Sequence, residues 1–521
     1  MSGLSRLSLF SRQTSVSNSS PAPNPCDAPA APQRAVEPSG WWLRPCGGRD
    51  VLAIALPLVI QSAFWSVMWF VDRLYLSWYS QDATAAALPG GMFHWVLICL
   101  PTGIASFVNT FVAQYHGAGR PRRIGVAVNQ GIWFGWATVP LFLLAIPVAP
   151  FLFRLVNHEV SVQRLEVIYF QVLALGAGAV VISNAQSSFY TGRGLTGIVM
   201  LVNAGGTLLD ICLEYAFIFG AFGLPEMGIA GAALTTVISN WATVLAFWWL
   251  LRRPAERETF GLDNDRLDWE IIRRLIRFGL PSGLPQFIEA GAFTFLTNAV
   301  TAVSVVAGAA TSLAFAINAL AFVPMIGLNI AVSTIVGQKL GENRPDLAER
   351  ATWTAMLLAM GYTGLCAMLY LIVPDWFLVL HTAFANDPTF PAVRQTTIGL
   401  LWFVALYCFF DATQIVLVGA LRGAGDTRFV LYNATAISAI SITTGLFLER
   451  YFGWKQSGYG LYGWWWIMTV WLLFLCLTYL LRFKQGRWKS IRVIEPELPD
   501  DEPPAGEPVT DLVEPAAEPA A

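Results

Sequence analysis

The sequence is poor in charge: only 13% of its 521 residues are Asp, Glu, Lys or Arg, against about 25% in soluble domains. It has four histidines and seven scattered cysteines, none of them in a CxxC pair. These shortages argue against a soluble protein, a Cys/His metal site and a disulfide scaffold. We expect no enzyme activity, no cofactor and no nucleic-acid partner.

Long apolar runs take the place of charge. Hydrophobic residues make up 55% of the chain, and the interval 290–338 contains no charged residue. Only helices and closed barrels satisfy the backbone in lipid, and these runs are too long for barrel strands. The sequence therefore predicts an all-α polytopic membrane protein. We expect about twelve spans, near 51–78, 90–115, 124–153, 167–190, 196–220, 227–251, 272–300, 308–338, 351–374, 395–420, 429–449 and 458–481.

A repeat links the two halves of the chain. "SFVNTFVAQYHGAGRPRR" (106–123) aligns with "NIAVSTIVGQKLGENRPDL" (329–347) at a shift of 224, which also places Pro57 on Pro281. Later motifs match at shifts of 229 to 232. With six spans each, the halves run in the same direction, as in transporters that bind substrate between two repeats.

The repeat and the composition together predict the domains. Lys and Arg gather in alternate joints, so the positive-inside rule places both termini in the cytoplasm. The first segment is rich in Ser, Pro and Ala, and the last is acidic and rich in Pro. Both are expected to be disordered. We predict a tail over 1–45, an N-terminal lobe over 46–251, a charged linker over 252–271, a C-terminal lobe over 272–485 and a tail over 486–521.

Five carboxylates fall in the predicted spans away from their ends, where each costs a few kcal/mol and usually marks an ion or proton path. Asp210 and Glu214 stand one turn apart on one helix face, so a shared proton or a bound cation would relieve their repulsion. Tyr407 stands one turn before Asp411, as an oxygen donor for a small cation. The five are Asp72, Asp210, Glu214, Glu289 and Asp411.

These acids do not follow the repeat. The shift of 224 pairs Asp72 with Leu296 and Glu289 with Trp65. An acid needed only to pack the two halves should occur in both, so the asymmetry favours function. Arg73, next to Asp72, either turns to the membrane interface or acts on a neighbouring acid.

The motifs "ALPL…FVDRLYLS", "VAQYHGAGR", "LEYAFIFGAFGLPEMGIAGAALTT" and "GALRGAGDT", in this order, resemble the multidrug and toxic compound extrusion (MATE) family. The resemblance covers roughly 50–485. It implies twelve helices in two six-helix lobes around a central cleft. It also implies export of organic, often cationic, compounds in exchange for Na⁺ or H⁺.

The resemblance assigns roles in the N-terminal half. Pro57 matches the proline that bends the first helix, and Asp72 matches its acid, with Arg73 in place of a small polar residue. Glu214 matches the acid of an "LDY.FIFG" stretch, in which Asp210 replaces the usual Asn. Thr236 matches a polar residue of the "GAA.AT" stretch.

In the C-terminal half, Glu289 matches the helix-seven acid. Tyr407 and Asp411 match the helix-ten pair of the sodium-coupled NorM-like branch. The resemblance thus implies a Na⁺ or proton site at these three residues. Because both lobes match, the coupling ion stays open between Na⁺ and H⁺.

We therefore expect a secondary antiporter of the inner (plasma) membrane. It would be a monomer in the lipid bilayer and would export small organic, cationic or amphipathic compounds by alternating access. A flippase for lipid-linked precursors is the nearest alternative, although such proteins tend to have extra spans and a cationic cavity. A lipid-modifying enzyme would need a polar cluster at one interface, which the sequence lacks. A channel is disfavoured by the paired, punctuated halves.

Overall fold

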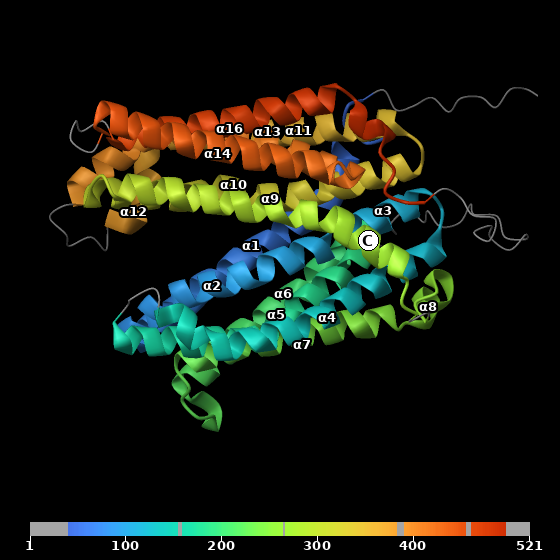
Figure 1. Ribbon diagram of the computed structural model, residues 1–521, viewed down its shortest axis with the longest axis horizontal. Helices are drawn as coiled ribbons and strands as arrows, with labels where there is room; N and C mark the ends of the chain where they lie inside the picture. Colours follow the sequence, from blue (N-terminus) through green and yellow to red (C-terminus); the bar gives the residue numbers. More distant parts are fainter. Residues whose placement is uncertain (1–39, 155–158, 264–265, 383–389, 455–459, 496–521) are drawn as a thin grey trace, which may run out of the picture.

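A computed structural model of the chain describes residues 40–154, 159–263, 266–382, 390–454 and 460–495. Long helices make up most of these residues (Figure 1). They are α1 (Gly48–Tyr79), α2 (Gln81–Ser106), α3 (Val108–Gly117), α4 (Pro121–Arg154), α5 (Val160–Gly192), α6 (Thr196–Phe219), α7 (Ile229–Leu251), α8 (Pro254–Phe260), α9 (Trp269–Thr301), α10 (Val305–Gly341), α11 (Pro345–Ile372), α12 (Pro374–Thr382), α13 (Phe390–Ala424), α14 (Thr427–Phe452) and α16 (Gly460–Lys484).

The helices form two bundles, with α1–α7 in the N-terminal bundle and α9–α16 in the C-terminal one (Figure 1). Eleven of the described helices are long and apolar enough to cross a membrane, with α2 and α3 counted as one. The helix α9 is also long, at 33 residues, but Arg273, Arg274 and Arg277 lie in its first turns. Together these helices account for the twelve predicted spans.

The two bundles exchange the first turns of their leading helices. Val51 and Ala55 of α1 are buried in the apolar core of the C-terminal bundle. Leu275 of α9, which the repeat pairs with Val51, is buried in a core of the N-terminal bundle. Each half therefore contributes one helix start to the other, so the predicted lobes are interlocked at this end.

Two glutamines related by the repeat join the bundles near the same end. Gln114 of α3 donates to the carbonyl of Gly423, in the last turn of α13, at 3.0 Å. Gln338 of α10 donates to the carbonyl of Gly192, at the end of α5, at 2.8 Å. The helices α5 and α13 are the fourth spans of their halves, so the two hydrogen bonds are reciprocal. We call this pair the glutamine latch.

Two glycines let α3 and α10 approach closely at the latch. A Cβ on Gly117 would clash with the carbonyl oxygen of Gln338, and one on Gly341 with that of Gln114. These glycines are also paired by the shift of 224. The ribbons of the two bundles lie close together at this end, near α3 and α8, and farther apart at the other (Figure 1).

The structure differs from the sequence prediction at several boundaries. The span predicted over 90–115 starts earlier and consists of α2 and α3, with Phe107 between them. The predicted linker contains the short helix α8. The tail predicted from residue 486 begins with an ordered part, in which Trp488 and Val493 are buried. The tail segments 1–39 and 496–521 lie outside the described residues.

Candidate functional site

Three carboxylates of the N-terminal bundle lie together between α1 and α6. The carboxyl groups of Asp72 and Glu214 lie within hydrogen-bonding range of each other. Asp210, one turn before Glu214 on α6, lies close enough to interact electrostatically with Asp72. Asp210 and Glu214 are almost fully buried, at 0% and 1% exposure. Two carboxyls in such contact need a proton or a cation between them.

The helix α7 lines the cluster with hydroxyl groups. Thr235, Thr236 and Ser239 lie near the carboxyl of Asp210. Each hydroxyl, however, donates to a backbone carbonyl of α7, Thr235 and Thr236 to Ala232 and Ser239 to Thr236. Neither oxygen of Asp210 or Glu214 accepts a hydrogen bond from a nitrogen or hydroxyl donor in the described chain. The cluster thus offers free acceptor oxygens in a buried place.

Two further side chains lie close enough to the cluster to interact electrostatically with its acids. Arg73 is half-buried and lies near Asp72, and Tyr169 of α5 lies near Asp72, Asp210 and Glu214. Because Tyr169 comes from α5, four helices meet at this site.

The acids of the C-terminal bundle are arranged more loosely. Asp411 and Tyr407 lie one turn apart on α13, and Glu289 lies on α9, near enough to interact electrostatically with Asp411. The hydroxyl of Tyr407 is buried without a hydrogen-bond partner in the described structure, and its ring packs against Trp465. The hydroxyl oxygen of Tyr407 thus has no partner in the described structure, as an oxygen that coordinates a cation would require.

A half-buried arginine accompanies these acids, and the sequence did not single it out. Arg422, in the last turn of α13, donates to the backbone carbonyl of Ser282 on α9 at 2.8 Å. Its guanidinium also interacts electrostatically with Glu289. Arg422 lies in the "GALRGAGDT" motif.

One buried carboxylate also escaped the sequence prediction. Glu166 is fully buried on α5, yet the predicted span began at residue 167. Its spacing of three residues from Tyr169 could have marked it, since both lie on one face of the helix. The acids Asp72, Asp210 and Glu214, predicted as one N-lobe site, do lie together.

The other two residues given roles by the resemblance, Pro57 and Thr236, lie on α1 and α7. Pro57 is inside α1, in the third turn from the latch end, and Thr236 faces the acid cluster from α7.

In the parts of the chain that the structure describes, no three His, Cys, Asp or Glu side chains come close enough to hold a metal ion.

A family model described as MatE matches the chain twice, over residues 57–216 and 281–446. The two matches start 224 residues apart, the same shift that aligns the motifs, and together they cover more than half of the chain. The model therefore supports the parallel repeat.

Curated relatives are named as multidrug resistance proteins. "Multidrug resistance protein PmpM" of Pseudomonas aeruginosa is 29% identical over 455 residues, which cover 85% of this chain and 92% of that protein. "Multidrug resistance protein MdtK" of Yersinia pestis is 26% identical over 404 residues, covering 77% of this chain and 87% of that protein. Both are named as resistance proteins and not as enzymes.

Solved structures share the fold. A MOP superfamily transporter from Pyrococcus furiosus superimposes with a TM-score of 0.75 at 20% identity, covering 85% of this chain and 97% of that one. The eukaryotic MATE transporter AtDTX14 gives 0.73 at 20% identity, covering 85% and 96%. Taken with the family model and the curated relatives, this fold shows that the chain belongs to the MATE family of multidrug efflux transporters.

Proposed function

We propose that this protein is a proton-coupled antiporter that exports organic cations. The observation that carries the proposal is the contact between the carboxyls of Asp72 and Glu214. Two carboxyls this close either share a proton, so that only one is ionised, or hold a cation between them. Proton entry from outside would neutralise the cluster, and proton release on the inner side would restore its charge.

Coupling follows if proton and substrate favour different states. A ligand shifts a conformational equilibrium only by its differential affinity for the two states. An ionised cluster attracts a cationic substrate, and a protonated one releases it. The membrane potential adds about 2.3 kcal/mol per charge per 100 mV and favours proton entry.

Aromatic rings next to the cluster favour a flat, cationic and amphipathic substrate. Trp65, Trp69 and Asp72 follow one face of α1 at helical spacing. The rings of Trp65 and Trp69 lie 5.5 Å apart, and Trp65 lies 6.2 Å from Trp95 of α2. Such rings attract cations by their negative faces. Glu289 and Asp411 would add negative charge from the C-terminal bundle, with Tyr407 beside them.

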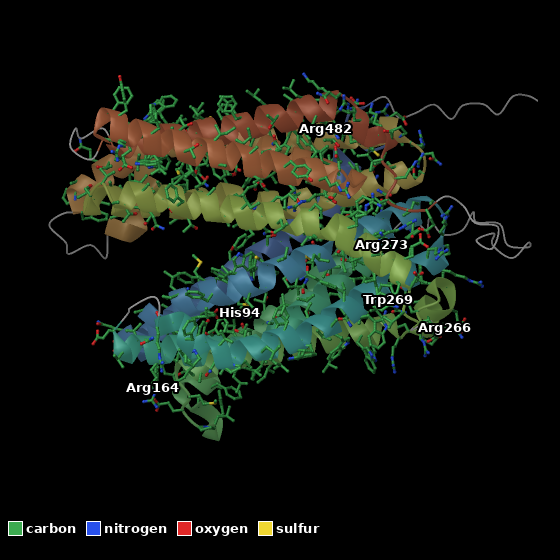
Figure 2. All side chains as sticks on the ribbon, in the orientation of Figure 1. His94, Arg164, Arg266, Trp269, Arg273 and Arg482 are labelled. Atoms are coloured by element: carbon green, nitrogen blue, oxygen red, sulfur yellow. The ribbon has the colours of Figure 1, made fainter. Side chains whose placement is uncertain are left out.

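The charge distribution supports an orientation in the inner membrane. Arg266, Trp269 and Arg273 lie toward the end that carries α8, and Arg164 lies toward the opposite end (Figure 2). By the positive-inside rule, the latch end faces the cytoplasm with both termini. The described conformation is then closed inward. We propose that a single copy suffices for transport, since each chain contains both lobes.

The coupling ion is the sharpest test of this proposal. Cells that lack their own pumps would express the protein, and efflux of an ethidium-type dye would be measured with Na⁺ and pH varied independently. We expect efflux that follows the pH gradient at any Na⁺ concentration. Efflux that needs Na⁺ and ignores pH would overturn proton coupling and favour a sodium site at Glu289, Tyr407 and Asp411.

A further inference from the structure

A basic groove lies at the start of α9, on the proposed cytoplasmic side. It has a volume of about 810 Å³ and lies between α9 and the first turn of α14, which pack together. Trp269 and Arg273 mark this place in Figure 2. The lining residues are Trp269, Ile272, Arg273, Ile276, Arg277 and Arg428.

The three arginines of the groove are exposed and uncompensated. No carboxylate of the described residues forms an ion pair with Arg273, Arg277 or Arg428, whereas the neighbouring Arg274 is paired with Glu270 and Glu495. Guanidinium groups bind phosphate by paired hydrogen bonds. Ile272 and Ile276 provide an apolar wall one turn apart, and Trp269 stands at the helix start as interfacial tryptophans do.

The N-terminal half offers an internal comparison. The repeat places Arg49, Ala53 and Ile198 where the C-terminal half has Arg273, Arg277 and Arg428. Only one of the three positions keeps its charge. Packing of the repeated fold therefore does not require these arginines.

We propose that this groove binds the headgroup of an anionic phospholipid. The three guanidinium groups hold the phosphate, and the acyl chains follow Ile272 and Ile276 toward the bilayer. Basic pockets between spans at the cytoplasmic side bind such headgroups. A zwitterionic lipid lacks the net charge that three unpaired arginines favour. The inference concerns lipid binding alone and does not depend on the proposed coupling.

Native mass spectrometry of the purified protein tests it, with phosphatidylglycerol and phosphatidylcholine added in turn. The variant R273Q/R277Q/R428Q should lose roughly a hundredfold in phosphatidylglycerol affinity, and R277Q alone about fivefold. The matched control R49Q should bind as the unaltered protein does. Equal binding of the two lipids, unchanged binding by the triple variant, or full displacement by inorganic phosphate would overturn the inference.

An independent observation concerns the segment after the last span. After α16 and the short helix η2 (Arg487–Ser490), residues 491–495 cross from the C-terminal bundle to the N-terminal one. Val493 is 2% exposed and lies in an apolar core of the N-terminal bundle. The segment also lies beside the glutamine latch, since Gln114, Gly341, Ile491 and Ile494 line one small cavity.

Glu495 anchors this segment by several polar contacts. Its Oε2 accepts hydrogen bonds from Tyr115 at 2.7 Å and from Arg274 at 2.6 Å. Its Oε1 lies 3.3 Å from Nε of Arg123. Arg120 donates to its backbone carbonyl at 2.9 Å. Charge-assisted contacts of this kind are the strong ones.

We infer that residues 491–495 form a strap that stabilises the closed state of the latch end. The bundles must separate there if the protein is to open on that side, and the strap joins the end of α16 to Tyr115 and Arg123 of the other bundle. Separation therefore requires Glu495 to leave its partners. The strap sets how often this side opens.

Hydrogen exchange measured by mass spectrometry tests the strap. In E495Q, peptides covering 108–117 and 332–341 should exchange roughly tenfold faster. A chain ending at Ser490 should exchange at least as fast. The control E258Q, an exposed acid on α8, should leave the rates unchanged. Unchanged exchange in both E495Q and the shortened chain would overturn the inference. Because the readout is exchange, the strap can fail while the proposed coupling holds, and the reverse.

Discussion

The two bundles share a scaffold but differ in how they hold their acids. In the N-terminal bundle, Asp72 and Glu214 lie within hydrogen-bonding range of each other, and Asp210 lies close to Asp72. In the C-terminal bundle, Glu289 and Asp411 come from α9 and α13, and Glu289 lies near Arg422. The first arrangement brings two carboxyls together, with Arg73 beside Asp72, whereas in the second the nearby positive charge faces a single acid, Glu289.

This difference shows that the repeated scaffold and the ionisable groups it carries follow different rules. The parts that join the bundles are duplicated: the glutamine latch, its glycines and the exchanged helix starts all obey the repeat. The ionisable groups are not. We assign proton uptake to the N-terminal bundle and attraction of the cationic substrate to both. The following predictions test that division.

The largest effect is expected for Asp72→Asn. The change removes one member of the carboxyl pair, so Glu214 no longer needs to share a proton. We expect efflux to fall to the level of cells without the transporter, as measured by dye fluorescence. The matched change at the repeat-related site, Leu296→Asn, tests whether any polar change in that buried position does the same. Efflux that survives Asp72→Asn would contradict the division.

Glu214→Gln should have the next largest effect. The introduced amide can donate a permanent hydrogen bond to Asp72, which takes the place of the shared proton. We expect about a tenfold fall in efflux rate, or ~1.4 kcal/mol, because the pair no longer takes up and releases a proton. The number of protons moved per dye molecule should fall as well. An unchanged proton count would place coupling elsewhere.

Glu289→Gln and Asp411→Asn should weaken substrate binding more than coupling. Each removes a negative charge that attracts a cation. We expect the dye concentration at half-maximal efflux to rise about tenfold, or ~1.4 kcal/mol, while efflux still follows the pH gradient. If both variants behave as the unaltered protein does, the C-terminal bundle has no role in binding or coupling. Loss of the pH dependence would move coupling to this bundle.

The smallest effects are expected at the latch. Gln114→Ala and Gln338→Ala each remove one hydrogen bond between the bundles, worth about 1 kcal/mol. Because the two bonds are reciprocal, both variants should shift the opening equilibrium by similar amounts, roughly fivefold. Cross-linking between exposed Glu342 and residues of the α3–α4 joint would report the separation. A large effect of one variant alone would show that the two hydrogen bonds of the latch stabilise the closed state unequally.

The sequence predicted the fold well because charge-free runs and the repeat depend on local composition and order. It also predicted the N-terminal site, since Asp210 and Glu214 share a helix face and Asp72 stood out in an apolar run. It missed Glu166 because the span boundary fell one residue too late. It missed the proximity of Arg422 to Glu289 and the anchoring of Glu495, since both depend on helices that meet across the fold.

The most direct test of proton coupling uses purified protein in proteoliposomes. Dye transport would be measured under a pH gradient at equal Na⁺ and then under a Na⁺ gradient at equal pH, for the unaltered protein, Asp72→Asn and Glu289→Gln. We predict transport driven by the pH gradient alone, abolished in Asp72→Asn and retained at higher dye concentration in Glu289→Gln. Transport driven by the Na⁺ gradient alone, or retained in Asp72→Asn, would contradict the assignment of the coupling proton to the N-terminal bundle.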